Sequence, residues 1–513
     1  MYSKIILLKN YTVNLKLSER PFKEFENSLI FGCPINLEEI GLSTSNEELG
    51  NKLKGYWLKV DIKDDKIVLT NDILGGYRVY YFIQGNNIYI SDNYSTILKD
   101  LQNIELKKNE VEFNYWLKHR FTSGKATFID GLKKLNPASV LEISENSFTE
   151  ISYFKDIKRF TNSVYHKNKI HEDLLNTFSL IKKAKTKTIL LFSGGKDSCL
   201  LLQYLLYFNI PFTPVFFKLN PISKFGLEDL KRVRAVAKQL GLQLDEVEIN
   251  LSDLTKEEQE TIIEKQLFDR HFSILHYKGS KIIKEKYGTN CIVINGQSSD
   301  SILSFGPSEN SLMSYFRRNI MYKPKTIISK LGVLLLMLKT KRKFKLPISK
   351  EEALVALFDE YKYTRVIDCQ VKKNYINYLK EYIKAQTKHL TSIYAKEMYV
   401  KILSFSQGSD NQVVVNSSKL NQLLTIMPFA TPNIIYTTIK YKDENLEIKK
   451  PKYIIERILE EEFAFHYDAL KIDQIDVSDV IINENTANIE IDSLFHEKAK
   501  SFFKSEKPIE AIR

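Results

Sequence analysis

Residues 188–202 constrain the fold of this chain more than any other stretch. An apolar run that begins at Thr188 ends abruptly in Ser-Gly-Gly-Lys-Asp-Ser at positions 193–198, and an apolar, helix-like pattern follows at once. This order predicts a buried parallel strand, a tight loop and the N-terminus of a helix. The two glycines allow the backbone to approach a ligand closely. The hydroxyl groups of Ser193 and Ser198, with the free N–H groups and positive dipole end of the helix, suit a phosphate.

The loop differs from a Walker A phosphate loop, because position 190 is Leu where that motif has Gly and Lys196 is followed by Asp. The string Ser-Gly-Gly-x-Asp-Ser instead resembles the signature of the ATP pyrophosphatases, the PP-loop enzymes. The resemblance implies that ATP is split between its α and β phosphates, that an acyl or heterocyclic oxygen is adenylated, and that the loop holds the departing pyrophosphate. It assigns nucleotide binding to Ser193, Gly194, Gly195, Asp197 and Ser198. An ordinary Gly-Gly turn between a strand and a helix is the alternative.

Alternating strand and helix patterns follow the loop. A strand-like run at 211–218 precedes a helical pattern over Leu227–Leu240, which stops at Gly241, and a further run covers 242–249. This rhythm predicts a parallel sheet with right-handed crossovers. Ligands bind such sheets beyond the carboxyl ends of the strands. A strand-like run from Cys291 again ends in a Gly turn and a carboxylate, so Asp197 and Asp300 are expected at the same edge of the sheet.

Residues 1 to about 155 have a different pattern. Short runs of β-branched and aromatic residues at 66–70, 80–83 and 87–90 are separated by clusters of Asn, Asp and Gly. Such spacing is typical of hairpins in an antiparallel layered domain. Residues 156–175 are polar and basic and predict a linker.

Several segments of this first part resemble, in order and spacing, the glutaminase domain of glutamine-dependent asparagine synthetases. These segments are Gly55–Leu58, Thr70–Tyr81, Ile90–Asp92 and Ala126–Pro137. The resemblance implies an α+β layered, Ntn-hydrolase-like domain in residues 1–160. It further implies an α/β parallel-sheet PP-loop ATP pyrophosphatase domain with a helical C-terminal part in residues 175–475, and a variable appendage in 476–513.

The N-terminal domain departs from that family at its nucleophile. The family uses an N-terminal Cys, exposed by removal of Met, whose own α-amine serves as the base, whereas this chain begins Met1-Tyr2-Ser3. A Tyr hydroxyl with a pKa of about 10 is a far weaker nucleophile at neutral pH than a thiol with a pKa of about 8.5. We therefore expect a degenerate domain without glutamine hydrolysis, similar to those of β-lactam synthetases and lasso-peptide cyclases.

The resemblance also gives roles to the turn after Cys291. Gly296 and Asp300 match the family's Gly-x-Gly-Ala-Asp-Glu stretch, whose Asp helps to bind Mg²⁺–pyrophosphate, while Ser301 replaces the family's Glu. Asp197 and Asp300 are thus the expected metal ligands, since two carboxylates with phosphate oxygens and waters suit Mg²⁺. An Asx turn or a helix N-cap is the alternative role for Asp300.

Further matches lie towards the C-terminus. Residues 427–432 resemble the family's PFLD turn with Thr431 in place of Asp, and residues 450–457 resemble its KxxLR helix. A catalytic Lys that stabilises the adenylation state or the oxyanion follows this helix in the family, and Lys471 stands at the corresponding distance here. Lys452 is also close by, and a surface ion pair is the other interpretation of Lys471.

Charge and composition limit the remaining options. The net charge of +12 is uneven, because residues 311–350 hold eleven Lys and Arg and no Asp or Glu. Either a buried helix with solvated basic ends or a surface for a polyanion accounts for this stretch. No apolar run approaches the ~20 residues of a membrane helix, no signal peptide is expected and nothing resembles a nucleic-acid-binding motif. The four scattered cysteines predict neither disulfides nor zinc. We expect a cytoplasmic protein.

These features together predict an ATP- and Mg²⁺-dependent amide-forming ligase of the asparagine synthase type. It would adenylate a small-molecule, carrier-linked or peptide carboxylate, release pyrophosphate and let ammonia or an amine attack. Free carboxylates do not react with amines at neutral pH, whereas adenylation supplies a leaving group and the site supplies proximity. Biosynthetic enzymes would be its partners. Two alternatives remain open: a lasso-peptide cyclase or other macrolactam-forming enzyme, and a non-catalytic nucleotide-binding scaffold.

Overall fold

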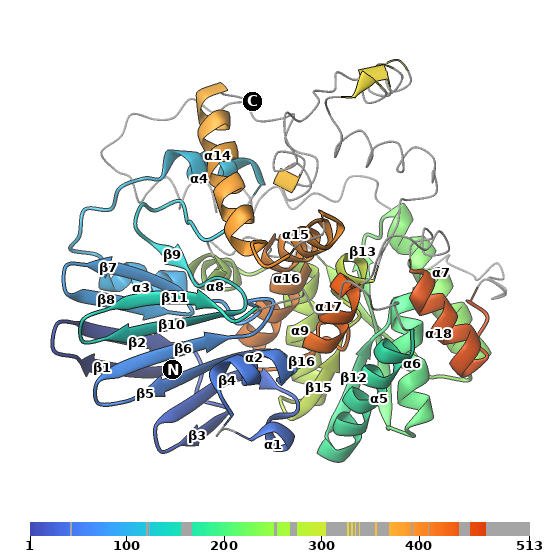
Figure 1. Ribbon diagram of the computed structural model, residues 1–513. Coiled ribbons are helices and arrows are strands. Elements are labelled where there is room, and N and C mark those ends of the chain that lie inside the picture. The colour runs from blue at the N-terminus through green and yellow to red at the C-terminus, as the bar shows by residue number, and fades with distance from the viewer. Residues whose placement is uncertain are drawn as a thin grey trace.

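Figure 1 shows the computed structural model of the protein, whose described residues form two units. The structure describes residues 1–41, 44–119, 122, 124–154, 167–250, 254–266, 274–303, 326–327, 330–331, 334, 338, 354–355, 369–390, 393–408, 410–440 and 452–467. Lys471, the appendage predicted at 476–513 and most of the basic stretch 311–350 lie outside these residues. In the part that is described, no helix combines the length and the hydropathy needed to cross a membrane.

The N-terminal unit contains two sheets. In sheet A the strand order is β1 (Tyr2–Leu7), β2 (Thr12–Leu17), β8 (Asn87–Ser91), β7 (Tyr80–Gln84) and β9 (Lys133–Lys134). In sheet B it is β11 (Phe148–Ser152), β10 (Ser139–Ser144), β6 (Lys66–Asn71), β5 (Gly55–Ile62), β4 (Ser28–Pro34) and β3 (Lys23–Phe25). All pairs are antiparallel except β2 with β8. The predicted layered, strand-rich architecture of this region is confirmed.

Alternating apolar residues of both sheets face one another and form a common core. In β2 and β6, for example, Val13, Leu15, Ile67 and Leu69 are fully buried in the same hydrophobic cluster. Helices α3 (Tyr94–Asp100) and α4 (Glu110–His119) cover the outer side of β7, and α1 (Leu37–Ile40) and α2 (Asn46–Lys52) pack on Trp57 of β5. The unit therefore consists of two sheets between helices.

The second unit is built on a parallel sheet, sheet C. Its strand order is β14 (Asp245–Asn250), β13 (Phe212–Asn220), β12 (Lys187–Leu191), β15 (Cys291–Ile294) and β16 (Leu424–Ile426). Each neighbouring pair is parallel. This confirms the predicted parallel sheet. The chain runs outward from β12 through β13 to β14 and then returns to the other side of β12, so the sheet reverses its order between β12 and β15. Such a reversal is where ligands bind in open α/β sheets.

The described helices of the second unit are α5 (Lys167–Ala184), α6 (Lys196–Tyr207), α7 (Lys224–Gln239), α8 (Lys256–Gln266), α9 (Ile274–Tyr287), α10 (Ser299–Ile302), α14 (Cys369–Gln386), α15 (Ile393–Gly408), α16 (Asp410–Asn421), α17 (Pro432–Lys440) and α18 (Tyr453–Phe463). Some of them cover the two faces of sheet C. Helices α6 and α7 pack on one face, and α9 packs on the other. The described residues after position 368 are mainly helical, as the sequence predicts.

The expected linker at 156–175 is wrong in its second half. Helix α5 begins at Lys167, and its buried residues Ile170, Leu174, Phe178 and Ile181 recur at helical spacing. The polar residues around Lys167 suggested a linker, but this apolar stripe gives the helix a face to bury.

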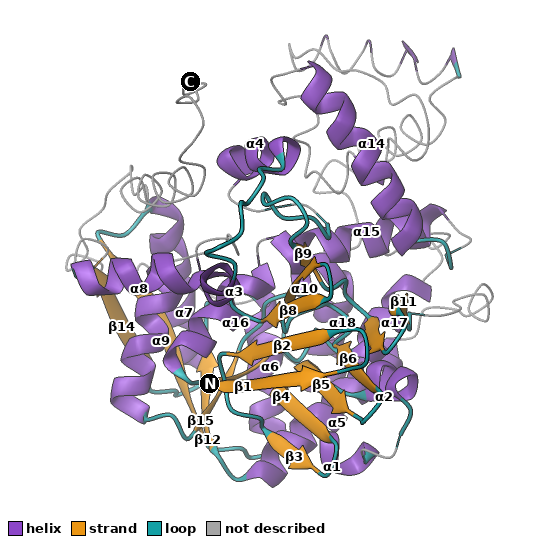
Figure 2. Cartoon of the chain, turned by 90° about the vertical axis from the view of Figure 1, so that its left-hand side faces the viewer, coloured by secondary structure: helices purple, strands orange, loops and turns teal. Residues whose placement is uncertain are grey.

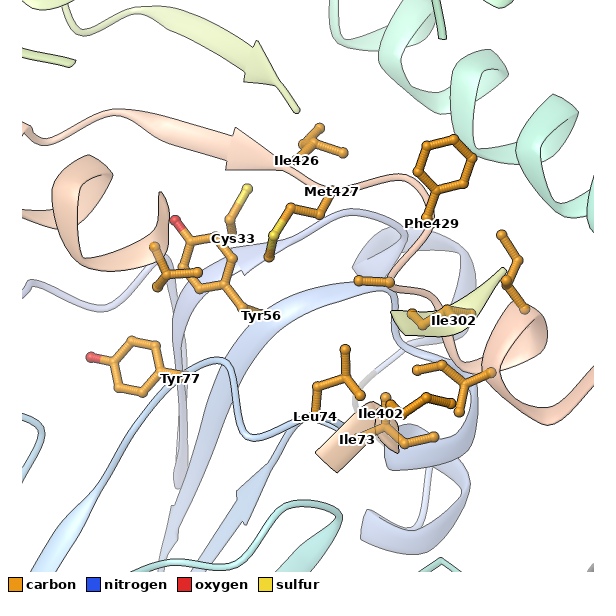
Figure 3. Close-up of a cluster of buried hydrophobic side chains, with 14 of the residues drawn as sticks. Cys33, Tyr56, Ile73, Leu74, Tyr77, Ile302, Ile402, Ile426, Met427 and Phe429 are labelled. Carbon is orange, nitrogen blue, oxygen red and sulfur yellow. The ribbon is translucent and has the colours of Figure 1, made fainter. Parts of the chain in front are cut away.

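The two units share one hydrophobic core. Figure 3 shows residues of the N-terminal unit, such as Tyr56 and Leu74, beside Ile302 and Met427 of the second unit. Figure 2, viewed from the N-terminal side, shows β1 and β2 in front of the parallel strands. A buried ion pair of 2.9 Å also joins Lys54 of the first unit to Asp173 of the second. The units thus pack directly against each other through apolar and charged contacts.

Candidate functional site

The loop between β12 and α6 is shaped by Gly194. Its φ is +69°, and a Cβ there would lie 2.8 Å from the backbone nitrogen of Val233 on α7. Only glycine adopts this conformation without strain and leaves room for the neighbouring helix. Gly195 is the N-cap of α6, and Asp197 and Ser198 lie in the first helical turn. The free N–H groups of this turn and the helix dipole face the carboxyl edge of sheet C, as a phosphate loop requires.

The turn after β15 lies directly against this loop. A Cβ on Gly296 would lie 3.4 Å from the Cβ of Asp197. Ser298 has a left-handed φ of +73° and caps the short helix α10, which contains Asp300. Asp300 is therefore not the N-cap of this helix, which was one of its two alternative roles. The structure brings Asp197 and Asp300 to the same edge of the sheet, beside the reversal of strand order.

Lys452 joins the two carboxylates. Its Nζ lies 2.5 Å from Oδ2 of Asp197 and 2.9 Å from Oδ1 of Asp300. Burial tends to lower the pKa of Lys452, but the two carboxylates outweigh it and the net shift is upward, so the side chain stays charged at neutral pH. Burial raises the pKa of Asp197, and the lysine offsets part of that rise. Lys452 is also strained, with a φ of +61° at the N-cap of α18.

Helix α18 makes further contacts with the loop. Lys196, the variable residue of the signature, forms an ion pair with Glu456, one turn after Lys452. The hydroxyl of Tyr467 donates a hydrogen bond of 2.9 Å to the carbonyl oxygen of Gly194, and the ammonium of Lys196 lies 5.1 Å from the centre of the Tyr467 ring. The segment from Lys452 to Tyr467 therefore holds the loop through contacts with three of its parts.

A cavity of about 360 Å³ opens beside the two turns. Its polar lining includes Ser193, Asp197, Gln297 and Asp300. Its apolar lining comes mainly from β13, with Leu275 of α9. A cavity of this size with both polar and apolar lining suits a nucleotide.

The donor set fits a hard divalent cation. One oxygen of Asp197, Oδ1, is buried and receives no hydrogen bond from the described residues. Asp300 keeps 61% of its side chain exposed. No cluster of three or more His, Cys, Asp or Glu ligands occurs within the described ranges. Mg²⁺ commonly takes one or two carboxylates and completes its shell with phosphate oxygens and waters. The pair could hold Mg²⁺ together with a nucleotide.

Two residues that depart from the family pattern have structural contacts instead. Ser301 is buried and donates its hydroxyl to the carbonyl of Ser298 at 3.0 Å. Thr431 is fully buried and donates to Asp173 Oδ2 at 2.5 Å, next to the ion pair with Lys54. Neither side chain lines the cavity.

Of the two lysines considered from the sequence, Lys452 is the one seen at the carboxylates, while Lys471 lies outside the described residues and its assignment stays a prediction. Sequence spacing named Lys452 only as a neighbour. The contacts of Glu456 and Tyr467 with the loop were missed, because no local pattern indicates a contact made across more than 250 positions.

The N-terminal unit offers no activated thiol among its described residues. Cys33 is buried, and burial raises the pKa of its thiol to about 12. Burial also raises the pKa of the Tyr2 hydroxyl, whose ring packs edge-on against Phe31. Both groups stay protonated at neutral pH and are poor nucleophiles.

Comparison with known proteins does not decide the family. No protein-family model and no curated protein sequence matches the chain. Similar solved structures include an NH₃-dependent NAD synthetase from Campylobacter jejuni in complex with nitrate, with a TM-score of 0.21 and 14% identity over 43% of this chain and 96% of that one. A glutamine-dependent NAD⁺ synthetase from Acinetobacter baumannii in complex with ADP has a TM-score of 0.20 and 10% identity over 61% of this chain and 70% of that one. The U34-tRNA thiolase NcsA from Methanococcus maripaludis, with its 4Fe-4S cluster, has a TM-score of 0.21 and 12% identity over 52% of this chain and 83% of that one. At these TM-scores the similarity carries no argument, so the resemblance to asparagine synthetases stays a prediction.

Proposed function

We propose that the protein is an ATP-dependent amide-forming ligase that adenylates a carboxylate and then joins it to ammonia or an amine. The observation that carries this proposal is the position of Lys452 between Asp197 and Asp300, beside a glycine loop at the reversal point of sheet C. The ammonium of Lys452 would stabilise the negative charge that develops when pyrophosphate leaves, and the two carboxylates could hold Mg²⁺ for the same purpose.

In this proposal each part of the site has a defined task. The loop N–H groups and the hydroxyls of Ser193 and Ser198 bind phosphate oxygens. Asp197 and Asp300 would hold Mg²⁺, which when bound neutralises charge on the leaving pyrophosphate. Lys452 exchanges its carboxylate contacts for phosphate oxygens when these ligands enter, and its raised pKa keeps it cationic for that purpose. Gly296 leaves room for the nucleotide beside Asp197.

The chemistry then runs in two steps. A carboxylate oxygen of the substrate attacks the α-phosphorus while the bond to the pyrophosphate oxygen breaks. The nitrogen nucleophile next attacks the acyl carbon and loses a proton, and AMP departs. The protein's contribution is to hold the reactants together and to exclude water from the acyl-adenylate. With no activated thiol described in the N-terminal unit, the nitrogen comes from free ammonia or from an amine on the substrate or a partner.

The test is carboxylate-dependent exchange of labelled pyrophosphate into ATP, with pooled carboxylates as substrates. Lys452→Met should lower the exchange rate about 100-fold, since one preorganised charge at such a site contributes on that order. Arg457→Met is the matched control, because Arg457 lies on the same helix and pairs with Glu461 instead. Tight ATP binding with no exchange under any substrate pool would favour the scaffold over the enzyme.

A further inference from the structure

One carboxylate in the wall of the cavity has no task in the proposed function. Three aspartates line this cavity, and two of them, Asp197 and Asp300, contact Lys452. The third is Asp229 on α7, whose side chain is 45% exposed. Among the described residues no three acidic, His or Cys side chains are arranged as a metal site, so Asp229 is not a third ligand beside that pair. Asp229 therefore needs a different role.

Helix α7 runs from the phosphate loop along the cavity. At Val233 it touches the loop, because a Cβ on Gly194 would lie 2.8 Å from the backbone nitrogen of Val233. Asp229 precedes Val233 by one helical turn, about 6 Å along the helix axis, and Gly226 precedes it by about 10 Å. The three residues have the spacing of one helix face, and Gly226 and Asp229 line the cavity. Asp229 thus lies one turn away from the loop.

The hydroxyl of Tyr467 also places Asp229 close to the loop. This hydroxyl donates a hydrogen bond of 2.9 Å to the carbonyl oxygen of Gly194. Burial raises the pKa of the hydroxyl to about 12, while the charge of Arg232 lowers it and the charge of Asp229 acts in the same direction as burial. Both charged groups therefore lie near the hydroxyl that binds the loop.

Arg232 holds the carboxylate of Asp229 in place. Its Nη1 donates a hydrogen bond of 2.8 Å to Oδ1 of Asp229. Burial raises the pKa of Asp229, and the arginine offsets part of that rise. An opposite charge at this distance also offsets much of the repulsion between the carboxylate and the phosphates of a nucleotide. An ionised carboxylate has about four acceptor positions, and this ion pair uses one of them.

A nucleotide whose phosphates bind the loop would meet α7 in a fixed order. The sugar follows the α-phosphate, and the base follows the sugar. The sugar would therefore meet Asp229, one turn from the loop, and the base would reach Gly226 and the apolar side chains of β13. Ribose carries two neighbouring hydroxyl donors. An acidic side chain accepts such a hydroxyl in dinucleotide-binding folds.

We propose that Asp229 accepts hydrogen bonds from the ribose hydroxyl groups of the bound nucleotide and thereby selects ribonucleotides. The proposal rests on the proposed ATP-dependent function and adds to it the residue that recognises the sugar. A hydrogen bond to a charged group changes affinity about tenfold or more, and the partial exposure of Asp229 favours the lower value.

Titration calorimetry with three nucleotides tests this directly. ATP, 2′-deoxy-ATP and 3′-deoxy-ATP differ only in the hydroxyl groups of the sugar, and each is titrated into the full chain with Mg²⁺ present. Wild-type protein should bind at least one of the two deoxynucleotides about tenfold more weakly than ATP. Asp229→Ala should bind all three with equal affinity, because the acceptor is removed.

Glu228→Ala is the matched control. Glu228 is the neighbouring residue on α7, is exposed and does not line the cavity. The substitution removes the same charge from the same helix. It should keep the tenfold preference for ATP, because a general change of charge alters the affinity for all three nucleotides by a common factor.

The outcomes separate this proposal from the proposed function. If wild-type protein binds none of the three nucleotides, the ATP-dependent function itself is wrong. If it binds all three equally, or if Asp229→Ala keeps the preference, only the role of Asp229 is wrong. Should Asp229→Ala fail to fold, Asp229→Asn keeps the shape and one acceptor oxygen but removes the charge. It should reduce the preference to about threefold, and an unchanged tenfold preference would overturn the proposal.

Discussion

Two aspartates show how differently the two units use the same side chain: Asp72 of the N-terminal unit is buried, and Asp197 of the second unit is partly buried. The carboxylate of Asp72 accepts backbone N–H groups from Trp57, Leu74, Gly76 and Tyr77 at 2.9 to 3.3 Å. Asp197 instead pairs with Lys452 through one oxygen, while its other oxygen is buried and accepts no hydrogen bond from the described residues. Burying a polar atom without a partner is costly, so the second oxygen of Asp197 is well suited to accept a cation or a water that enters the cavity.

The surroundings of the two aspartates differ in the same way. Asp72 sits beside a tightly packed core, where a Cβ on Gly76 would lie 2.9 Å from Tyr56. Asp197 lines a cavity. The N-terminal unit thus uses its buried carboxylate to fix a loop, whereas the second unit places a carboxylate in the wall of a cavity.

Replacing Asp197 should have the largest effect on chemistry. Asp197→Asn removes a negative charge at the proposed metal and phosphate site, and we expect pyrophosphate exchange to fall about 100- to 1,000-fold. Stability should not fall, because burial already disfavours the charged form of this side chain. Asp245→Asn, at the far edge of sheet C beside Lys286, is the matched control and should retain exchange. Unchanged turnover in Asp197→Asn would remove the site assignment.

Replacing Asp72 should affect stability instead. Asp72→Ala leaves four backbone N–H groups without their acceptor, and we expect it to lower the free energy of unfolding by about 3 kcal/mol in urea titrations. Asp72→Asn keeps one acceptor oxygen and should lose less. Protein that remains folded should keep its exchange rate. A folded but inactive Asp72→Ala protein would contradict the division between a structural and a catalytic unit.

The sequence predicts both of the turns that carry the carboxylates of Asp197 and Asp300. Apolar runs that end in glycine and a carboxylate predicted both β12 with its loop and β15 with its turn, and parallel pairing placed Asp197 and Asp300 at one edge. This part succeeds because the signals are local and the sheet geometry converts them into proximity.

The contacts made by distant segments were not predictable in this way. Lys452 reaches the loop from the start of α18 through a left-handed backbone conformation that no sequence pattern indicates. Lysine is also frequent in the chain, so spacing could not separate Lys452 from Lys471. Thr431 matched a family turn by position, but its hydroxyl binds Asp173 in a buried network between the units. Tertiary packing decides the role of such residues.

Acid should lower the free energy of unfolding through protonation of His276 on α9. The expected decrease is smaller than the one caused by Asp72→Ala. The folded pKa of about 4 lies below the value of about 6.5 in an unfolded chain. The neutral imidazole therefore contributes stability that is fully present above pH 6.5 and is lost as the pH falls towards 4. The shift corresponds to at most about 3 kcal/mol, and partial exposure reduces it to about 2 kcal/mol. Unfolding titrations from pH 7 to 4 should show this loss in wild-type protein, and a smaller loss in His276→Leu. Parallel curves would show that His276 titrates normally.

The smallest effect is expected at the groups of the N-terminal unit that a glutaminase would need to activate. Burial raises the thiol pKa of Cys33 to about 12 and also raises the hydroxyl pKa of Tyr2, so neither group supplies an anion at neutral pH. We expect no glutamate from glutamine, and Cys33→Ala and Tyr2→Phe should change ammonia-supported turnover by less than about twofold, because both residues lie outside the residues that line the cavity. The measurement is glutamate release, run beside pyrophosphate exchange on the same samples. Glutamate formation that disappears in either variant would show that the N-terminal unit performs chemistry. The difference in hydrogen bonding between the carboxylates of Asp72 and Asp197 would then not distinguish a structural unit from a catalytic one.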